Sequence, residues 1–198
     1  MPIPEKVTLY HEKNLLDRVI DNVAGQEQPL SDSDLNRVTV AAQIQAGIDR
    51  YRAQASTLSN QSLFEEEHNS SRLGMHLVES GHPRPSKCHA HAVVAGKHQY
   101  AARLRLFMSR LKIRIDDSDN GCWLPENIAA TPHPAFPKAL PHSRVHRFNY
   151  YFWIHSWLIA FSNERDFRNG LQLIARRLQY GGVPPYVMLP KGVGLPKG

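Results

Sequence analysis

The stretch from residue 88 to residue 146 constrains this chain most, because two groups of histidines flank an Asn-Gly pair within it. The first group lies in residues 88–91 and the second in residues 142–146. Between them, Asn120-Gly121 predicts a tight turn, since this pair supplies the positive φ that such turns require. The stretch therefore predicts a small site built on strand, turn and strand.

Apolar periodicity and local breakers predict the other elements. Helices are expected over residues 6–24, 32–55, 98–112 and 163–179, and from Pro141 past residue 159. Short apolar or β-branched runs predict strands over residues 90–95, 113–115 and 122–124. The polar residues 56–71 predict a loop or solvated helix face, and the prolines between residues 125 and 141 predict an irregular segment. We expect an α+β protein, mainly helical, with a central hairpin.

The prolines of residues 82–86 place a boundary near residue 80. We therefore expect a helical extension over residues 1–80 and a domain that carries the chemistry over residues 81–180. Residues 181–198 are rich in glycine and proline and predict a flexible, poorly packed tail.

The net charge of +6 and the pI near 9.5 favour an anionic partner such as nucleic acid. Two cysteines are too few for a disulfide framework, so we expect both to be reduced and partly buried. No apolar run reaches the ~18 residues of a membrane span, which predicts no membrane partner. The N-terminus lacks the order of a signal peptide, so we expect synthesis in the cytoplasm and any export without a cleaved signal.

His142 and His146 are four residues apart, so a helix would present both on one face, where two imidazoles can bind one divalent ion. Histidines at this spacing are also common on plain surface helices. His91, on the strand before the turn, could supply a third ligand. We expect the other histidines to have no role as ligands: His155 should lie half a turn off the ligand face, and approach of His133, in the proline-rich segment, to the site is only the lesser alternative. His11, His68, His76 and His98 are expected at the surface.

Several segments together resemble the AHH family of the HNH/endonuclease VII superfamily, nuclease domains that often serve as toxins in bacterial competition. They are Ala90-His91-Ala92-Val93-Val94-Ala95-Gly96, Ile115-Asp116-Asp117, Asn120-Gly121, Leu124-Pro125 and His142-Ser143-x-x-His146. The resemblance covers about residues 80–158. It implies a ββα-metal fold of the HNH type, in which a hairpin and a helix hold one divalent ion.

The resemblance also implies roles for single residues. His91, His142 and His146 would hold the metal, and Asn120 would hold the loop and orient the catalytic base. The second histidine of the family motif would be the general base, but this chain has Ala92 there, which cannot accept a proton. An alternative makes His89 a ligand and His91 the base, since strand alternation puts both on one face.

We interpret Ala92 as an inactivating substitution, because an active toxin would harm the cell that makes it; a naturally degenerate nuclease is the competing interpretation. Three imidazoles favour zinc or another late transition metal on affinity, but geometry and availability decide which ion is bound in a cell. The expected cofactor is therefore one divalent ion, Zn, Mg, Mn or Ni. Basic side chains near the site are expected to contact phosphates, although each could equally be a solvated charge. They are Arg84, Lys87, Arg103, Arg105, Arg144 and Arg147.

The function expected from the resemblance is a metal-dependent DNase that acts as a secreted antibacterial toxin in the cytoplasm of a target cell. Such a toxin implies a cognate immunity protein and a secretion carrier or chaperone. One alternative is an RNase of the same fold. Another is a non-catalytic, metal-stabilised binding module, in which Cys88 or Cys122 would close the metal site as a fourth ligand.

Overall fold

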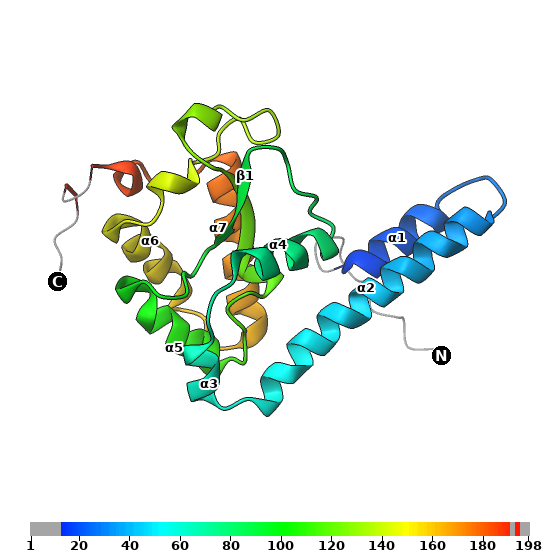
Figure 1. Ribbon diagram of the computed structural model, residues 1–198, viewed down its shortest axis with the longest axis horizontal. Helices are drawn as coiled ribbons and strands as arrows, with labels where there is room; N and C mark the ends of the chain where they lie inside the picture. The colour runs from blue at the N-terminus through cyan, green and yellow to red at the C-terminus, as the bar shows by residue number, and fades with distance from the viewer. Residues whose placement is uncertain (1–12, 191–192, 195–198) are drawn as a thin grey trace, which may run out of the picture.

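The computed structural model describes residues 13–190 and 193–194. Two antiparallel helices, α1 (Leu15–Ala24) and α2 (Asp32–Thr57), form an arm that extends away from the rest of the chain (Figure 1). Both predicted helices are confirmed over the described residues, and residues 6–12 of the first lie outside them.

Each arm helix begins with a capping box, which satisfies free backbone N–H groups of the first turn. Asn14 pairs with Asp17 at the start of α1, and Ser31 pairs with Asp34 at the start of α2. The helix α1 ends at Gly25, as its sequence predicts.

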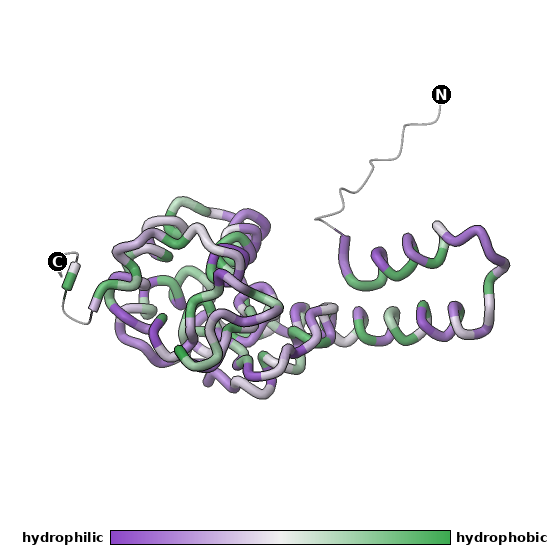
Figure 2. Tube along the Cα trace, turned by 90° about the horizontal axis from the view of Figure 1, so that it is seen from above, coloured by the Kyte–Doolittle hydropathy of each residue, from purple (hydrophilic) through white to green (hydrophobic). Residues whose placement is uncertain are grey.

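The two helices of the arm run side by side (Figure 2). The arm buries little apolar surface of its own. Its buried apolar side chains are Val23, Ala41, Ile48 and Ala55. Its exposed ones are Ile20, Leu30, Leu35 and Val40. Since burial of apolar surface drives folding, the arm depends on its junction with the rest of the chain for a fixed position.

Two short helices follow the arm, α3 (Asn60–Glu65) and α4 (Ser70–Glu79). The sequence predicts a loop or a solvated helix face over residues 56–71; α3 is a helix, but its buried Leu63 packs toward α5, so this part of the segment is not fully solvated. Leu73 and Leu77 of α4 are buried in the main hydrophobic core. Tertiary packing thus decides the conformation of a segment whose own composition favours a loop.

The sheet has two antiparallel strands, β1 (Cys88–Ala92) and β2 (Gly121–Pro125). Their register pairs His91 with Cys122 and Ala92 with Gly121. Long-range pairing replaces the predicted hairpin, because residues 113–115 form no strand and residues 93–120 connect the two strands. The helix α5 (Ala102–Arg110) lies in this connection, preceded by the 3-10 turn η2 (Gln99–Ala101).

The Asn-Gly pair does not form the predicted tight turn. Asn120 ends the 3-10 turn η3 (Ser118–Asn120), and Gly121 starts β2 with φ −129°. A Cβ on Gly121 would lie 2.7 Å from Cδ1 of Leu73, so glycine here allows α4 to approach the sheet closely.

The remaining helices complete the core. After the irregular proline segment, which contains η4 (Ile128–Ala130), the chain forms η5 (His142–Arg144), α6 (Phe148–Leu158) and α7 (Glu164–Tyr180). The turn η6 (Pro185–Met188) packs against α6 with Val187 fully buried. The prediction of a poorly packed tail is therefore wrong around η6, and residues 191–192 and 195–198 lie outside the described residues.

The α+β fold class, mainly helical with a small central sheet, is confirmed. The boundary near residue 80 stays a prediction, although Leu73 and Leu77 belong to the same core as both strands. Within the described ranges, none of the helices combines the length and apolar character needed to cross a membrane.

Candidate metal centre

His91 sits on the fourth position of β1 and is fully buried. Side chains alternate across a strand, so His89 and His91 share one face while Ala90 and Ala92 share the other. The helix α4 covers the second face, where a Cβ on Gly74 would lie 3.7 Å from Cβ of Ala90. The imidazole of His91 therefore projects away from α4, toward the segment that follows the proline-rich loop.

His142 and His146 lie on that segment but not on one helix, so their predicted helical arrangement is wrong. His142 opens η5, directly after Pro141, and His146 lies in the connection between η5 and α6. The chain is extended at Arg147, with φ −127° and ψ 164°, which separates the two helical elements. Val145, fully buried, fixes the turn between the two histidines in the core.

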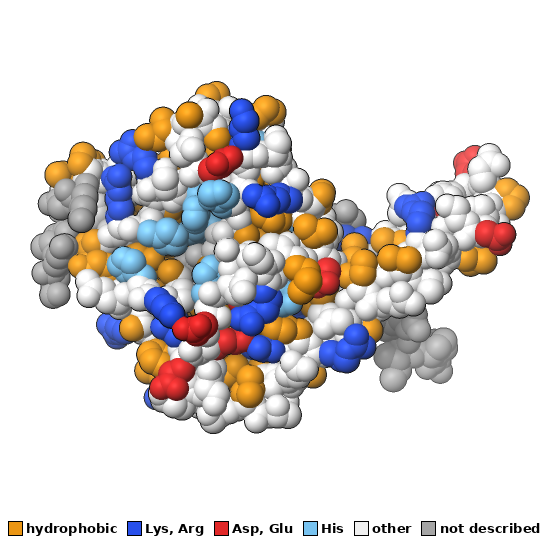
Figure 3. All heavy atoms as spheres, viewed as in Figure 1, with side chains coloured by type: hydrophobic (Ala, Val, Ile, Leu, Met, Phe, Trp, Pro, Cys, Tyr) orange, Lys and Arg blue, Asp and Glu red, His pale blue; other side chains and the backbone are white. Residues whose placement is uncertain are grey.

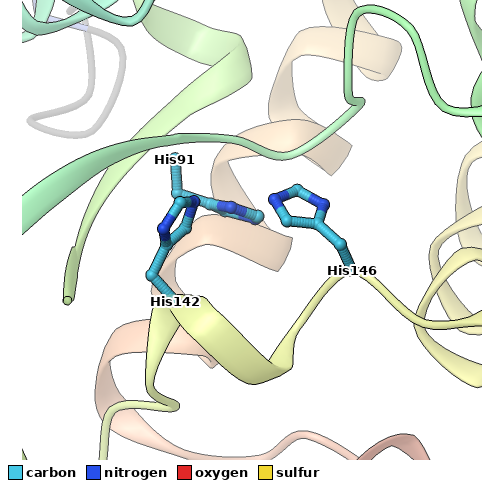
Figure 4. Close-up of side chains that lie close together, drawn as sticks. All are labelled: His91, His142 and His146. Atoms are coloured by element: carbon cyan, nitrogen blue, oxygen red, sulfur yellow. The ribbon is translucent and has the colours of Figure 1, made fainter. Parts of the chain in front are cut away.

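The three histidines nevertheless meet at one point (Figure 4). One ligand nitrogen from each of His91, His142 and His146 lies within 4.8 Å of the others. Ring centroids are 5.3 Å apart for His91 and His142, 5.0 Å for His91 and His146, and 5.4 Å for His142 and His146. Three imidazole nitrogens so arranged can bind a single divalent ion with little movement.

Hydrogen bonds define which ring nitrogen of His91 has a free lone pair that can bind a metal ion. The hydroxyl of Tyr150 donates to the carbonyl of Val93 at 2.7 Å, so it can only accept at its 3.1 Å contact with Nε2 of His91. Nε2 therefore carries the proton, and Nδ1 carries the lone pair. Nδ1 is buried and has no hydrogen-bond partner, which is the arrangement that a metal ligand requires.

A second tyrosine orients a second ligand. Nδ1 of His146 lies 2.9 Å from the hydroxyl of Tyr151, which leaves Nε2 available for a metal. Sequence reasoning missed both tyrosines. Their only signal is their position four and five residues after His146, which becomes meaningful once α6 is seen to start at Phe148.

Burial lowers the pKa of all three imidazoles, and neighbouring histidines lower it further. The pKa of His91 falls well below its ordinary value, and that of His146, the exposed member of the three, falls to about 4. All three are therefore neutral at pH 7, and neutral imidazole is the form that binds metal ions. The donor set fits a late transition cation such as zinc.

The thiols do not close the site. Among the described residues, the group that could hold a metal contains histidine alone. Cys88 is buried with Sγ 3.7 Å from Nε2 of His133, and Cys122 is buried in the core, where desolvation strongly raises its thiol pKa. Both cysteines are free, as predicted, but more deeply buried than expected. Three ligands leave a position open, which is typical of catalytic sites and not of structural ones.

Asn120 holds the loop that continues β1. Its amide nitrogen donates to the carbonyls of Val94 and Ile115, and its Oδ1 accepts from the amide of Val94 at 2.8 Å. Ala92 ends the strand beside this loop and is buried. Asn120 thus holds the segment that follows Ala92, and Ala92 follows His91 directly in β1 with its side chain on the opposite face.

The predicted phosphate contacts differ in availability. Lys87 and Arg103 are exposed, and Arg144 is half-buried. The remaining three guanidinium groups hold the fold by donating to backbone carbonyls, which sequence alone does not reveal. Arg84 donates to Cys88, Arg105 to Phe64 and Arg147 to Leu189.

Among the other histidines, His133 stays out of the cluster as expected, but His76, His68 and His98 are less exposed than predicted. His133 binds the carbonyl of Ser86 and does not join the cluster, and His76 is buried against the carbonyl of Asp116 rather than exposed. His68 is half-buried against the Asp116 carboxylate, and His98 stacks on Tyr151. His11 lies outside the described residues. His89 lies near His142, with ring centroids 5.6 Å apart, but is not one of the three clustered ligands.

Comparison with known families gives one match. A model for a nuclease family of the HNH/ENDO VII superfamily with conserved Ala-His-His, named AHH, matches residues 73–175, just over half of the chain. The chain belongs to the AHH family. The matched range contains Ala90-His91-Ala92, the segment that resembles the family's conserved triplet. No curated protein and no solved structure matches the chain.

Proposed function

We propose that this AHH protein is a metal-dependent endonuclease that hydrolyses DNA backbone phosphodiesters. The observation that carries the proposal is the cluster of three neutral imidazoles around the unpartnered Nδ1 of His91, in a chain of a nuclease family. A divalent ion held there would neutralise charge on a phosphate and its leaving oxygen.

Each residue of the site has a distinct role in this proposal. His91, His142 and His146 would hold the ion, with Tyr150 and Tyr151 fixing the rings of His91 and His146. Asn120 keeps the loop after β1 in place, so that residue 92 stays at a fixed distance from the ligands. The exposed Lys87 and Arg103, together with Arg144, are proposed to contact phosphates of the nucleic acid.

Ala92 makes the chain a weak enzyme under this proposal. A histidine at this position would take a proton from water, a step that contributes about a hundredfold to ten-thousandfold to the rate. We infer that the substitution protects a producing cell from its own toxin, since members of this family often serve as toxins. The biological role proposed is therefore that of a secreted antibacterial effector with a cognate immunity protein and a carrier or chaperone, acting in the cytoplasm of a target cell.

The test is cleavage of supercoiled plasmid by this chain and by its Ala92→His variant, each with added zinc, nickel, manganese or magnesium. We expect Ala92→His to raise the rate of nicking by about a hundredfold or more, and a chelator to abolish it. An Ala95→His variant, which adds a histidine elsewhere in the same loop, is the matched control and should not gain activity.

Two results would contradict the proposal. If Ala92→His binds metal but cleaves RNA and leaves DNA intact, the substrate class is RNA and the protein is an RNase of the same fold. If it cleaves neither polymer, the cluster serves as a metal-stabilised binding module and the catalytic proposal fails.

A further inference from the structure

His68 and Asp116 form a second group of polar side chains in the domain. It lies in the loop before α4, and its Nδ1 is 2.5 Å from Oδ1 of Asp116. The other oxygen of this carboxylate accepts from the amide of Asn69 at 3.0 Å and from Nε of Arg72 at 2.7 Å. Asp116 is fully buried, and these contacts fix both of its oxygens.

The ionisation state of Asp116 determines which ring nitrogen of His68 carries the proton. Burial alone would raise the pKa of Asp116, but the bonds from His68, Asn69 and Arg72 outweigh it and leave the pKa below its ordinary value. The carboxylate is therefore ionised at neutral pH and can only accept, so Nδ1 of His68 donates to it. In neutral His68 the lone pair then lies on Nε2, which has no hydrogen-bond partner among the described residues.

The loop that continues β1 packs directly on His68. A Cβ on Gly96 would lie only 2.5 Å from Cβ of His68, so the absence of a side chain at Gly96 permits this contact. The same loop is the one that Asn120 holds through Val94. His68 is thus fixed against the segment that begins one residue after Ala92.

His68 also stands on the side of the sheet that Ala92 faces. Strand alternation directs Ala92 toward the face that α4 covers, and His68 immediately precedes the N-cap of α4. About a quarter of the His68 side chain is exposed, 27%, so it reaches solvent. In its protonated form, His68 adds a small lowering to the pKa of each of the three clustered histidines, after burial and their nearer histidine neighbours. Histidine side chains accordingly gather on one face of the domain (Figure 3).

We propose that His68, held by Asp116, acts as the general base of this chain in place of the histidine that Ala92 lacks. The inference rests on the proposed nuclease function. Nε2 of His68 takes a proton from water, the water oxygen bonds to phosphorus, and the bond from phosphorus to the leaving sugar oxygen breaks. That oxygen takes a proton from solvent. His68 lies before the family match, which starts at residue 73, so the family assigns it no role.

The experiment compares His68→Gln in two backgrounds, the natural chain and the Ala92→His variant. In the natural chain, His68→Gln should lower metal-dependent plasmid nicking by about a hundredfold, the contribution of a general base. In the Ala92→His background, where residue 92 supplies the base, it should lower the rate by less than about threefold. His82→Gln, an exposed histidine near the arm junction, is the matched control and should change neither rate.

Two readouts separate a base from a structural histidine. Added imidazole should restore nicking to His68→Ala in the natural chain, because a soluble imidazole can accept the proton. In the metal-free protein, nitrogen NMR should show His68 with its proton on Nδ1, a readout that needs no catalysis. A proton on Nε2 instead would remove the lone pair and overturn the inference.

The outcomes also distinguish this inference from the proposed function. The inference fails alone if Ala92→His nicks DNA while the natural chain shows no metal-dependent nicking. It also fails alone if His68→Gln slows both backgrounds equally, since that result indicates a structural role. If Ala92→His binds metal and cleaves nothing, the proposed function fails and the inference fails with it.

Discussion

Two polar clusters lie within the same domain, and they differ in whether side chains of opposite charge surround them. The acidic cluster, Asp116, Asp117 and Asp119, receives hydrogen bonds from arginines of three different helices, with Arg52 on α2, Arg72 on α4 and Arg168 on α7. The histidine cluster, His91, His142 and His146, is a group of bases that no carboxylate joins within the described residues. The acidic cluster thus has its cationic partners within the chain, whereas the histidine cluster has the ligand atoms to hold an added cation.

Breaking the acidic cluster should give the largest effect. Arg168 is nearly buried and bonds Asp117 at 2.7 Å, so Arg168→Met leaves Arg52 as the one cationic partner of the buried Asp117 carboxylate among the described residues. Removing one partner of a buried ion pair lowers the free energy of unfolding by about 3–5 kcal/mol. We expect a loss at the lower end of this range because Arg52 still pairs with Asp117. Urea unfolding of the metal-free protein measures this loss.

The control for this variant is Arg176→Met, an exposed arginine on the same helix, which should change the unfolding free energy by less than about 0.5 kcal/mol. Zinc affinity should be the same in both variants. Equal stability of Arg168→Met and Arg176→Met would show that the acidic cluster does not hold α7 and the arm.

Changing the support of the histidine cluster should have the next largest effect. Tyr150→Phe removes the acceptor of the His91 Nε2 proton, so the ring loses the bond that fixes its tautomer. Removal of such a supporting group lowers metal affinity by about tenfold to a hundredfold. A zinc competition assay measures it, with the exposed Tyr180→Phe as the control. Unchanged affinity in Tyr150→Phe would refute the assigned tautomer.

Acid should weaken the acidic cluster by a smaller amount. Burial opposes ionisation of Asp117, but Arg168 and Arg52 outweigh it and leave the pKa below 3.8; Asp116 is likewise lowered. A lowered folded pKa stabilises the fold above the unfolded value, and this stability is lost as pH falls through the folded pKa. Unfolding free energy should therefore decline below about pH 4, and less steeply in Asp117→Asn than in the parent. An equal decline in both would contradict the pairing.

The sequence predicts which histidines meet but not how they are held. His91, His142 and His146 come together as expected, yet the i, i+4 helix predicted for the second pair is absent. Spacing alone cannot show that Val145 is buried and that Arg147 is extended, because both depend on packing against the core. Most helices were predictable because their apolar periodicity is local.

The non-local features were beyond sequence reasoning. Asn120-Gly121 reads as a hairpin turn, but Asn120 instead binds Val94 and Ile115, and Gly121 makes room for α4. His68 has no local pattern that connects it with Asp116, which is 48 residues away. Such contacts form only when the chain folds and β1 pairs with β2, two strands that α5 separates in the sequence.

The most direct test of this account is a zinc titration of the metal-free chain and its His91→Ala variant, read by calorimetry. We expect the natural chain to bind one zinc ion. In His91→Ala the zinc affinity should fall by more than about a hundredfold, because removing a ligand should cost more affinity than removing a group that only supports a ligand. A His155→Ala control should bind zinc as the natural chain does. Absence of stoichiometric binding, or equal binding by His91→Ala, would contradict the claim that this cluster is built for a metal.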